Sequence, residues 1–167
     1  MIRNKIEYNG NGFLVWGYAT IFFSLLIYLC LKLTSNGLFY ILYAGVPISA
    51  NIVTTLLQKD KSRSKLEILI DKIWTVFGIL ALLSCLGRYF YPFPLFAFIS
   101  FLMGLETTVT GIIIKDRTVS LFGFIGILSV IPFVIISGHE QNLIITVVFF
   151  FIAVIPGHIT NYKARKG

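Results

Sequence analysis

The chain has 167 residues, of which 57% are hydrophobic and only 13% are charged, whereas a soluble domain carries about 25% charged residues. The mean hydropathy is +0.88, and the charged residues are grouped, which leaves long uncharged runs between them. These values exclude an ordinary soluble domain and indicate an integral membrane protein in contact with a lipid bilayer.

Six apolar segments reach the roughly 20 residues that a helix needs to cross a hydrocarbon core of about 30 Å. Helices are expected rather than barrel strands, because the segments are apolar around most of their circumference. The first segment is too long for a signal-peptide core, and no A-x-A-like cleavage pattern follows it, so we expect it to remain in the protein. The predicted fold is an all-α bundle in one membrane domain, with spans at residues 12–34, 37–58, 67–87, 92–114, 118–137 and 142–161.

The basic residues predict the orientation of these spans. With six spans both termini lie on one side, and that side collects twelve of the fourteen Lys and Arg residues. The opposite side keeps Lys32 and Arg88, so both termini are predicted to be cytoplasmic. The net charge of +7 is therefore assigned to topology and anionic lipid, and we expect no nucleic-acid partner. The twelve are Arg3, Lys5, Lys59, Lys61, Arg63, Lys65, Lys72, Lys115, Arg117, Lys163, Arg165 and Lys166.

Two blocks separated by 56 positions resemble each other. Residues 53–61 (VTTLLQKDK) and 109–117 (VTGIIIKDR) share four identical positions, and each block ends an even-numbered span. The chain length is close to three times 56, which favours three helical hairpins related by an internal repeat.

Small residues follow one face of the fourth and fifth predicted helices, where they favour close helix packing in lipid. The fourth has Ser100, Gly104, Thr107 and Gly111 at spacings of three and four. The fifth has Gly123, Gly126 and Ser129. We expect these residues to mark helix–helix interfaces.

Glu106 is the one charge in the apolar run from Tyr89 to Ile114. A carboxyl group inside a membrane span is costly and needs a partner or a function. From the helical rise of about 1.5 Å per residue, Glu106 lies roughly 13 Å inside the cytoplasmic boundary and Asn51 roughly 12 Å inside it. Asp71 and His158 lie in a shallower layer, and Thr54 and Thr110 extend the polar faces of the second and fourth helices. The outer half offers only scattered Ser and Thr.

Two interpretations of these polar residues stay open. In the first, they form hydrogen bonds between helices, each worth roughly 0.6–2 kcal/mol, and Glu106 is protonated because burial disfavours its charged form. In the second, a cavity opens to the cytoplasm, with Glu106 at its closed end and Asp71 and His158 near its mouth. Pro47 and Pro156 would free backbone carbonyl groups next to these polar patches.

Motifs that would indicate catalysis or cofactor binding are missing from the sequence. It has no His-Glu-x-x-His run, no Gly-x-Ser-x-Gly elbow and no glycine-rich phosphate loop, so we expect neither an enzyme nor a bound cofactor. Cys30 and Cys85 do not form a zinc motif. We expect both thiols to be free, although the oxidising outer face also allows a disulfide.

The leading prediction is a transport- or channel-like membrane protein with Glu106 as a proton or cation site and Asn51, Asp71 and His158 as neighbours. The alternative is a membrane subunit without its own chemistry that binds a partner, or a second copy of the chain, in the bilayer. Convergence of the four side chains on one cavity would favour transport. Side chains that are paired off separately would favour the subunit. The identity of the solute or ion stays open.

The six-helix layout and the segment FLMGLETTVTG at residues 101–111 resemble small uncharacterised bacterial six-helix membrane proteins. They are also similar to the short-repeat acid-resistance membrane proteins. The resemblance implies a location in the bacterial inner membrane. It implies no mechanism and assigns no functional residue.

Overall fold

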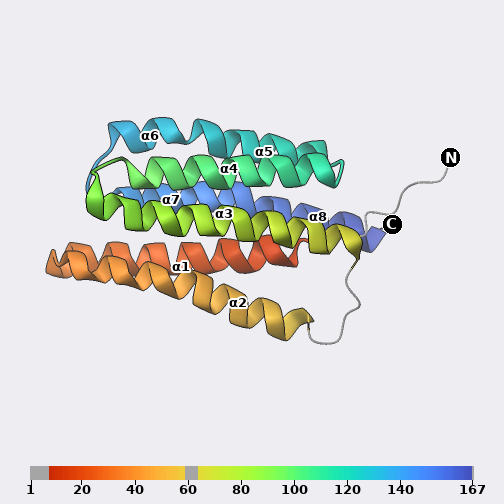
Figure 1. Cartoon of the computed structure of the whole chain (residues 1–167), viewed down its shortest axis with the longest axis horizontal. Helices are drawn as coiled ribbons and strands as arrows, with labels where there is room; N and C mark the ends of the chain where they lie inside the picture. Colours follow the sequence, from red (N-terminus) through yellow and green to blue (C-terminus); the bar gives the residue numbers. More distant parts are fainter. Residues whose placement is uncertain (1–7, 59–63, 167) are drawn as a thin grey trace.

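The computed structural model describes residues 8–58 and 64–166. These residues form helices joined by short turns, with no strand in the described ranges. Figure 1 shows the helices lying side by side along one common direction, with α1 beginning and α8 ending at the same end of the bundle. We call this the terminal end and the opposite one the distal end. The helices are α1 (Asn11–Thr34), η1 (Gly37–Ala44), α2 (Gly45–Gln58), α3 (Lys65–Phe90), α4 (Leu95–Ile113), α5 (Arg117–Leu128), α6 (Val130–Ile135), α7 (Gln141–Phe149), η2 (Phe150–Val154) and α8 (Ile155–Lys166).

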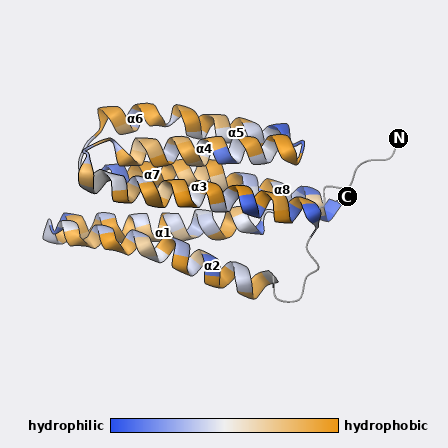
Figure 2. Ribbon diagram, viewed as in Figure 1, coloured by the Kyte–Doolittle hydropathy of each residue, from blue (hydrophilic) through white to orange (hydrophobic). Residues whose placement is uncertain are grey.

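Six helical segments in the described residues are long and apolar enough to cross a membrane. They agree with the six predicted spans to within a few residues, except that the last continues to Lys166. Figure 2 shows hydrophobic residues along the bundle and hydrophilic ones gathered at the terminal end. The all-helical class and the number of long apolar segments are therefore confirmed.

Three of the six segments change helix type along their length. The second begins as the 3-10 helix η1 and continues as α2. The fifth is interrupted at Ser129 between α5 and α6. The sixth contains a π-helical turn, η2, between α7 and α8. Prolines explain two of these sites, because Pro132 and Pro156 each remove the amide that would bond to the carbonyl four residues earlier.

The fourth segment begins three residues later than predicted. Pro92 and Pro94 disfavour a helical conformation in the residues before them, and α4 starts directly after Pro94. The third segment runs on to Phe90. The connection between the third and fourth segments is therefore residues 91–94.

The fourth and sixth segments form the centre of the bundle. In their most apolar windows 44% and 50% of residues are buried, against 11% and 6% for the second and third segments. One core cluster joins α4, α6, α7 and η2 toward the distal end, around Phe133 and Phe149. A second joins α1, α3, α4 and α5 toward the terminal end, around Phe13 and Ile70. The α2 and α3 helices lie at the periphery, and α2 packs mainly against α1.

The predicted small-residue interface between the fourth and fifth segments is confirmed. A Cβ atom added to Gly104 would lie 2.4 Å from the backbone nitrogen of Ile127, and one added to Gly123 would lie 2.3 Å from that of Thr108. The hydroxyl groups of Ser100 and Ser129 lie 2.6 Å apart across the same interface. Only residues without a Cβ permit this backbone approach.

Hydrogen bonds at helix ends fix the connections at the terminal end. Ser64 and Glu67 form a capping box at the start of α3, and Glu67 also accepts a hydrogen bond of 2.8 Å from Asn9. The α1 and α8 helices are tied together by a 2.8 Å bond from Asn161 Nδ2 to Asn11 Oδ1. These bonds hold the ends of three helices, α1, α3 and α8, in one layer.

Some of the sequence predictions depend on residues that are not described. Arg3, Lys5, Lys59, Lys61 and Arg63 lie outside the described residues, and so does the end of the block 53–61. The 56-residue repeat stays a prediction. Cys30 on α1 and Cys85 on α3 are both free thiols.

Candidate functional site

Glu106 is buried in the middle of the bundle. Its side chain projects from α4, and the residue is only 3% exposed. The Oε1 atom has no hydrogen-bond partner among the described residues. Leaving a buried polar atom unpaired costs about 1–3 kcal/mol, and most buried side-chain polar atoms in proteins have a partner. Glu106 therefore differs from a carboxyl group that only joins two helices.

A cavity of about 40 Å³ lies against Glu106. Its walls come from α1, α3, α4, α7 and η2, and most of the lining side chains are apolar or aromatic. The chain contains two tryptophans, and both line this cavity. The lining residues are Phe13, Trp16, Trp74, Gly78, Met103, Glu106, Thr107, Phe149, Ile152 and Ala153.

Thr110 positions one wall of the cavity. It lies one turn after Glu106 on α4, is fully buried, and accepts a hydrogen bond of 3.2 Å from Trp74 Nε1 on α3. The Trp74 ring also packs edge-to-face against Phe13, with 5.0 Å between ring centroids. The predicted polar residue Thr110 thus lies next to the site and orients an aromatic ring of its wall.

The π-helical turn supplies a hydrogen bond beside the same cavity. Pro156 has no amide hydrogen, so the carbonyl of Ile152 lacks its usual α-helical donor. The Thr107 hydroxyl on α4 donates to that carbonyl at 3.3 Å. The prediction that Pro156 frees a carbonyl group is supported by this contact, which uses the hydroxyl hydrogen of Thr107.

Asn51 and Thr54 do not join Glu106. Asn51 is exposed on α2, and its amide donates a 2.7 Å bond to the carbonyl of Pro47 in the same helix. Thr54 Oγ1 is buried without a partner among the described residues, but it does not line the cavity. Because α2 packs against α1 and not against α4, equal depth did not bring Asn51 next to Glu106, and that expectation was wrong.

Asp71 and His158 also lie outside the cavity lining. His158 is exposed on α8, and its Nε2 atom lies 2.9 Å from the Tyr18 hydroxyl on α1. Asp71 is half-buried on α3. Of the four side chains whose convergence on one cavity would favour transport, only Glu106 lines the cavity. The separate placement of the other three favours a subunit without its own chemistry, and the case for transport rests on Glu106.

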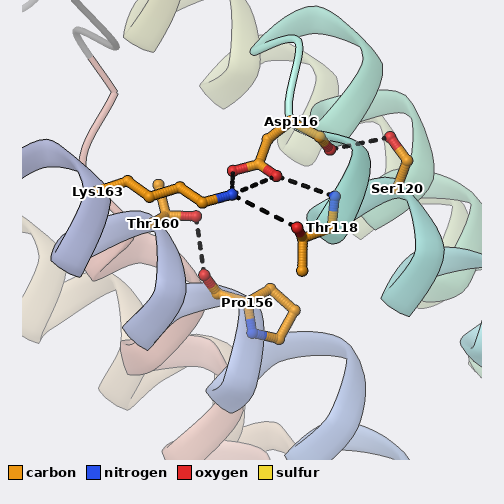
Figure 3. A network of polar contacts seen from close by, with 6 residues as sticks. All are labelled: Asp116, Thr118, Ser120, Pro156, Thr160 and Lys163. Carbon is orange, nitrogen blue, oxygen red and sulfur yellow. Dashed lines mark hydrogen bonds and ion pairs between the residues drawn. The ribbon is translucent and has the colours of Figure 1, made fainter.

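An ion pair at the terminal end was not foreseen from the sequence. Lys163 Nζ lies 2.6 Å from Asp116 Oδ2 and 2.8 Å from Oδ1 (Figure 3). Asp116 also caps α5, because its Oδ1 accepts a 3.0 Å bond from the Thr118 amide. Burial raises the pKa of Asp116, but the hydrogen bond and charge of Lys163, together with backbone amides, outweigh it, and the pKa lies below its ordinary value. An aspartate directly before a helix was the available signal for the cap, whereas the pairing with Lys163 had none.

The terminal end also holds a neutral phenol. Tyr8 is 5% exposed. Burial raises the pKa of its hydroxyl group, and the carboxyl groups of Glu106 and Glu67 add smaller contributions in the same direction. Tyr8 is therefore an uncharged part of the core cluster around Phe13.

The distal half holds a polar cluster, contrary to the expectation of scattered Ser and Thr. The Tyr43 hydroxyl donates a 2.8 Å bond to Oδ1 of Asn142 and lies 3.1 Å from the Ser24 hydroxyl. Asn142 is fully buried. The cluster joins η1, α1 and α7 and leaves these polar groups paired, as expected for a structural contact.

No group of three or more His, Cys, Asp or Glu side chains that could hold a metal ion occurs within the described ranges. Comparisons with protein-family models, with curated proteins and with solved structures found no match for the chain. The interpretation of the Glu106 cavity therefore rests on its residues and their geometry.

Proposed function

We propose that the protein is an integral membrane protein of the bacterial inner membrane, with six transmembrane helices and both termini in the cytoplasm. Six long apolar helices support this proposal. So does the grouping of basic residues at one end, where Lys65 begins α3, Arg117 begins α5 and Lys166 ends α8. Lys32 lies at the other end of α1. An excess of Lys and Arg marks the cytoplasmic side of a membrane protein.

In this membrane the protein acts as a transport- or channel-like protein whose Glu106 carboxyl binds a proton or a cation. One observation carries the proposal: the Glu106 Oε1 atom is buried, has no partner among the described residues and adjoins a cavity. Intramembrane carboxyl groups that serve only as helix contacts are expected to be paired. A carboxyl group that must take up and release an ion needs a free acceptor atom in at least one of its states.

The other predicted site residues have different roles in this proposal. Thr110 orients Trp74 beside Glu106 and is a positioning residue. Asn51, Thr54, Asp71 and His158 are not assigned to the ion, because none of them lines the cavity. The proposal contains no catalytic reaction and needs no cofactor.

Flux measurements on purified protein in proteoliposomes test this function. A proton or monovalent-cation flux is expected for the unmodified protein and is expected to fall to the background of empty liposomes in Glu106→Gln, which keeps the side-chain shape but cannot ionise. Glu140→Gln makes the same chemical change at an exposed position and is expected to leave the flux unchanged. A flux that is equal in Glu106→Gln and in the unmodified protein would refute the proposal.

A second candidate is a membrane subunit without its own chemistry that binds a partner or a second copy of the chain. The separate placement of the predicted polar residues favours it, because the Asn51 amide bonds within α2 and His158 lies against Tyr18, both outside the Glu106 cavity. The α2 helix, on which Ile48, Ile52 and Leu56 are exposed, is a weakly covered helix that a partner could contact. Cross-linking in native membranes separates the two candidates. A specific cross-linked species through α2, together with no flux in any variant, would support the subunit.

A further inference from the structure

The walls of the Glu106 cavity carry an unusual share of aromatic rings. Phe13 and Trp16 come from α1, Trp74 from α3, and Phe149 from α7. Glu106 is the only ionisable side chain among the described residues that line the cavity. We call Glu106 and these four rings the aromatic cage.

Aromatic rings and a carboxylate attract the same kind of ligand. The face of an aromatic ring carries negative electrostatic potential and attracts an ammonium group within about 6 Å of its centroid, most strongly for tryptophan. A carboxylate adds a charge and accepts hydrogen bonds from N–H groups. In a site screened from water both attractions are stronger than at a surface.

The cage is held in place by contacts of its own. Trp74 is fixed by its hydrogen bond to Thr110 and by its edge-to-face contact with Phe13. Trp16 lies edge-on to Trp74, with 6.4 Å between ring centroids. Phe13 is fully buried and Phe149 is 5% exposed. A ligand would meet these rings with little loss of side-chain freedom.

The size and chemistry of the cavity restrict the cation. About 10–15 Å³ holds one water molecule, so a cavity of about 40 Å³ admits about three groups of that size. A bare metal ion needs several oxygen ligands to replace its hydration shell, whereas the lining side chains offer one carboxyl group, that of Glu106, and one hydroxyl oxygen, that of Thr107. A small protonated amine needs fewer acceptors and can place its carbon atoms against the rings.

We propose that the aromatic cage is a binding site for a small protonated amine of the size of methylammonium, with Glu106 as its counter-ion. This inference rests on the proposed function, because it takes Glu106 to be a cation site and names the class of the cation. Binding of the cation to the carboxylate displaces the carboxyl proton, so the affinity for methylammonium rises with pH.

Tryptophan fluorescence tests the cage directly, because both tryptophans of the chain line it. Methylammonium chloride is titrated into the full-length protein in lipid nanodiscs, with potassium chloride and tetramethylammonium chloride at equal ionic strength as controls. We expect a saturable change in emission with methylammonium. We expect none with tetramethylammonium, which is too large, and none with potassium.

Three variants complete the experiment. Glu106→Gln is expected to weaken methylammonium binding by more than about tenfold, whereas Glu140→Gln is expected to leave it unchanged. Phe13→Leu removes one ring and keeps an apolar side chain, and is expected to weaken binding by about two- to thirtyfold. Phe149→Leu repeats that test from another wall if Phe13→Leu does not fold.

The outcomes separate this inference from the proposed function. Equal methylammonium binding by the unmodified protein and Glu106→Gln would overturn the cage, and so would an equal response to potassium. No response to methylammonium, together with a pH-dependent emission that Glu106→Gln removes, would overturn the amine site but support Glu106 as a proton site. Emission that depends neither on methylammonium nor on pH through Glu106 would overturn both.

Discussion

The close contact between α4 and α5 predicts opposite effects for the same substitution at two glycines. Gly104 lies in the interface, and an added Cβ would be 2.4 Å from the Ile127 nitrogen and 2.6 Å from the Gly126 carbonyl carbon. Gly78 lies in the interior of α3, and an added Cβ would meet no atom within 4 Å. Alanine is therefore compatible with the structure at Gly78 and incompatible with it at Gly104.

The magnitude follows from these distances. Ordinary van der Waals contact begins at 3.4 Å, so Gly104→Ala would require the helices to separate by about 1 Å at a backbone atom that cannot rotate away. Overpacking of this kind costs about 1–3 kcal/mol. Gly78→Ala is expected to stabilise the protein by about 0.5–1 kcal/mol, because alanine has the higher helix propensity.

Reversible unfolding in mixed micelles, followed by far-UV circular dichroism, measures both variants under one condition. The free energy of unfolding is expected to differ by about 1.5–4 kcal/mol between them, with Gly104→Ala the less stable. The reasoning would be refuted if Gly104→Ala were as stable as Gly78→Ala, because the backbone contact would then not limit the approach of α4 and α5.

Two further predictions concern the turn between α4 and α5. The lowered pKa of Asp116 means that its charged form stabilises the fold above the ordinary pKa of 3.8, and that this stabilisation is lost as the pH falls through the folded-state value. Asp116→Asn, which keeps a capping acceptor, is expected to lower the free energy of unfolding by about 1 kcal/mol at pH 7. In a pH series, the difference in unfolding free energy between this variant and the unmodified protein is expected to shrink below pH 3.8. A difference that stays constant with pH would contradict the role of the Lys163 pair. Lys115 has a left-handed φ of 57°, so Lys115→Gly is expected to stabilise the protein by up to about 1 kcal/mol, measured by the same unfolding assay. Lys115→Ala is the control and is expected to have little effect, and equal stability of the two variants would show that the backbone at this position is not strained.

Much of the fold could be predicted because hydropathy and helix length act locally. A helix satisfies its own backbone hydrogen-bonding groups within one segment, so each long uncharged run could be assigned to one helix without knowing its neighbours. The number of long helices and their approximate ends followed from these runs. The small-residue face of Ser100, Gly104 and Gly111 also predicted a close interface correctly, because helical spacing alone places these residues on one side. The 3-10 start of the second segment and the break at Ser129 were missed, since they depend on how each segment meets its neighbours.

The candidate site was predicted only in part. Glu106 was selected because a charge in an apolar run is visible in the sequence, and Thr110 because it lies one turn away on the same helix. Asn51 and His158 were grouped with Glu106 by depth, which gives a position along the bundle axis but no direction around it. The tryptophans of the cage were not singled out, because aromatic residues in apolar helices are ordinary in composition and become informative only when they meet around one carboxyl group.

The sequence by itself determined that this protein is helical, that six of its segments can cross a membrane, and that one of them carries a carboxyl group. These properties depend on composition and spacing along single segments. The tertiary structure alone decided that Glu106 faces two tryptophans and a cavity, while Asn51, Asp71 and His158 face elsewhere. Those directions depend on how each helix is rotated about its own axis and on which helices it packs against. Both result from packing between helices that are far apart in the sequence.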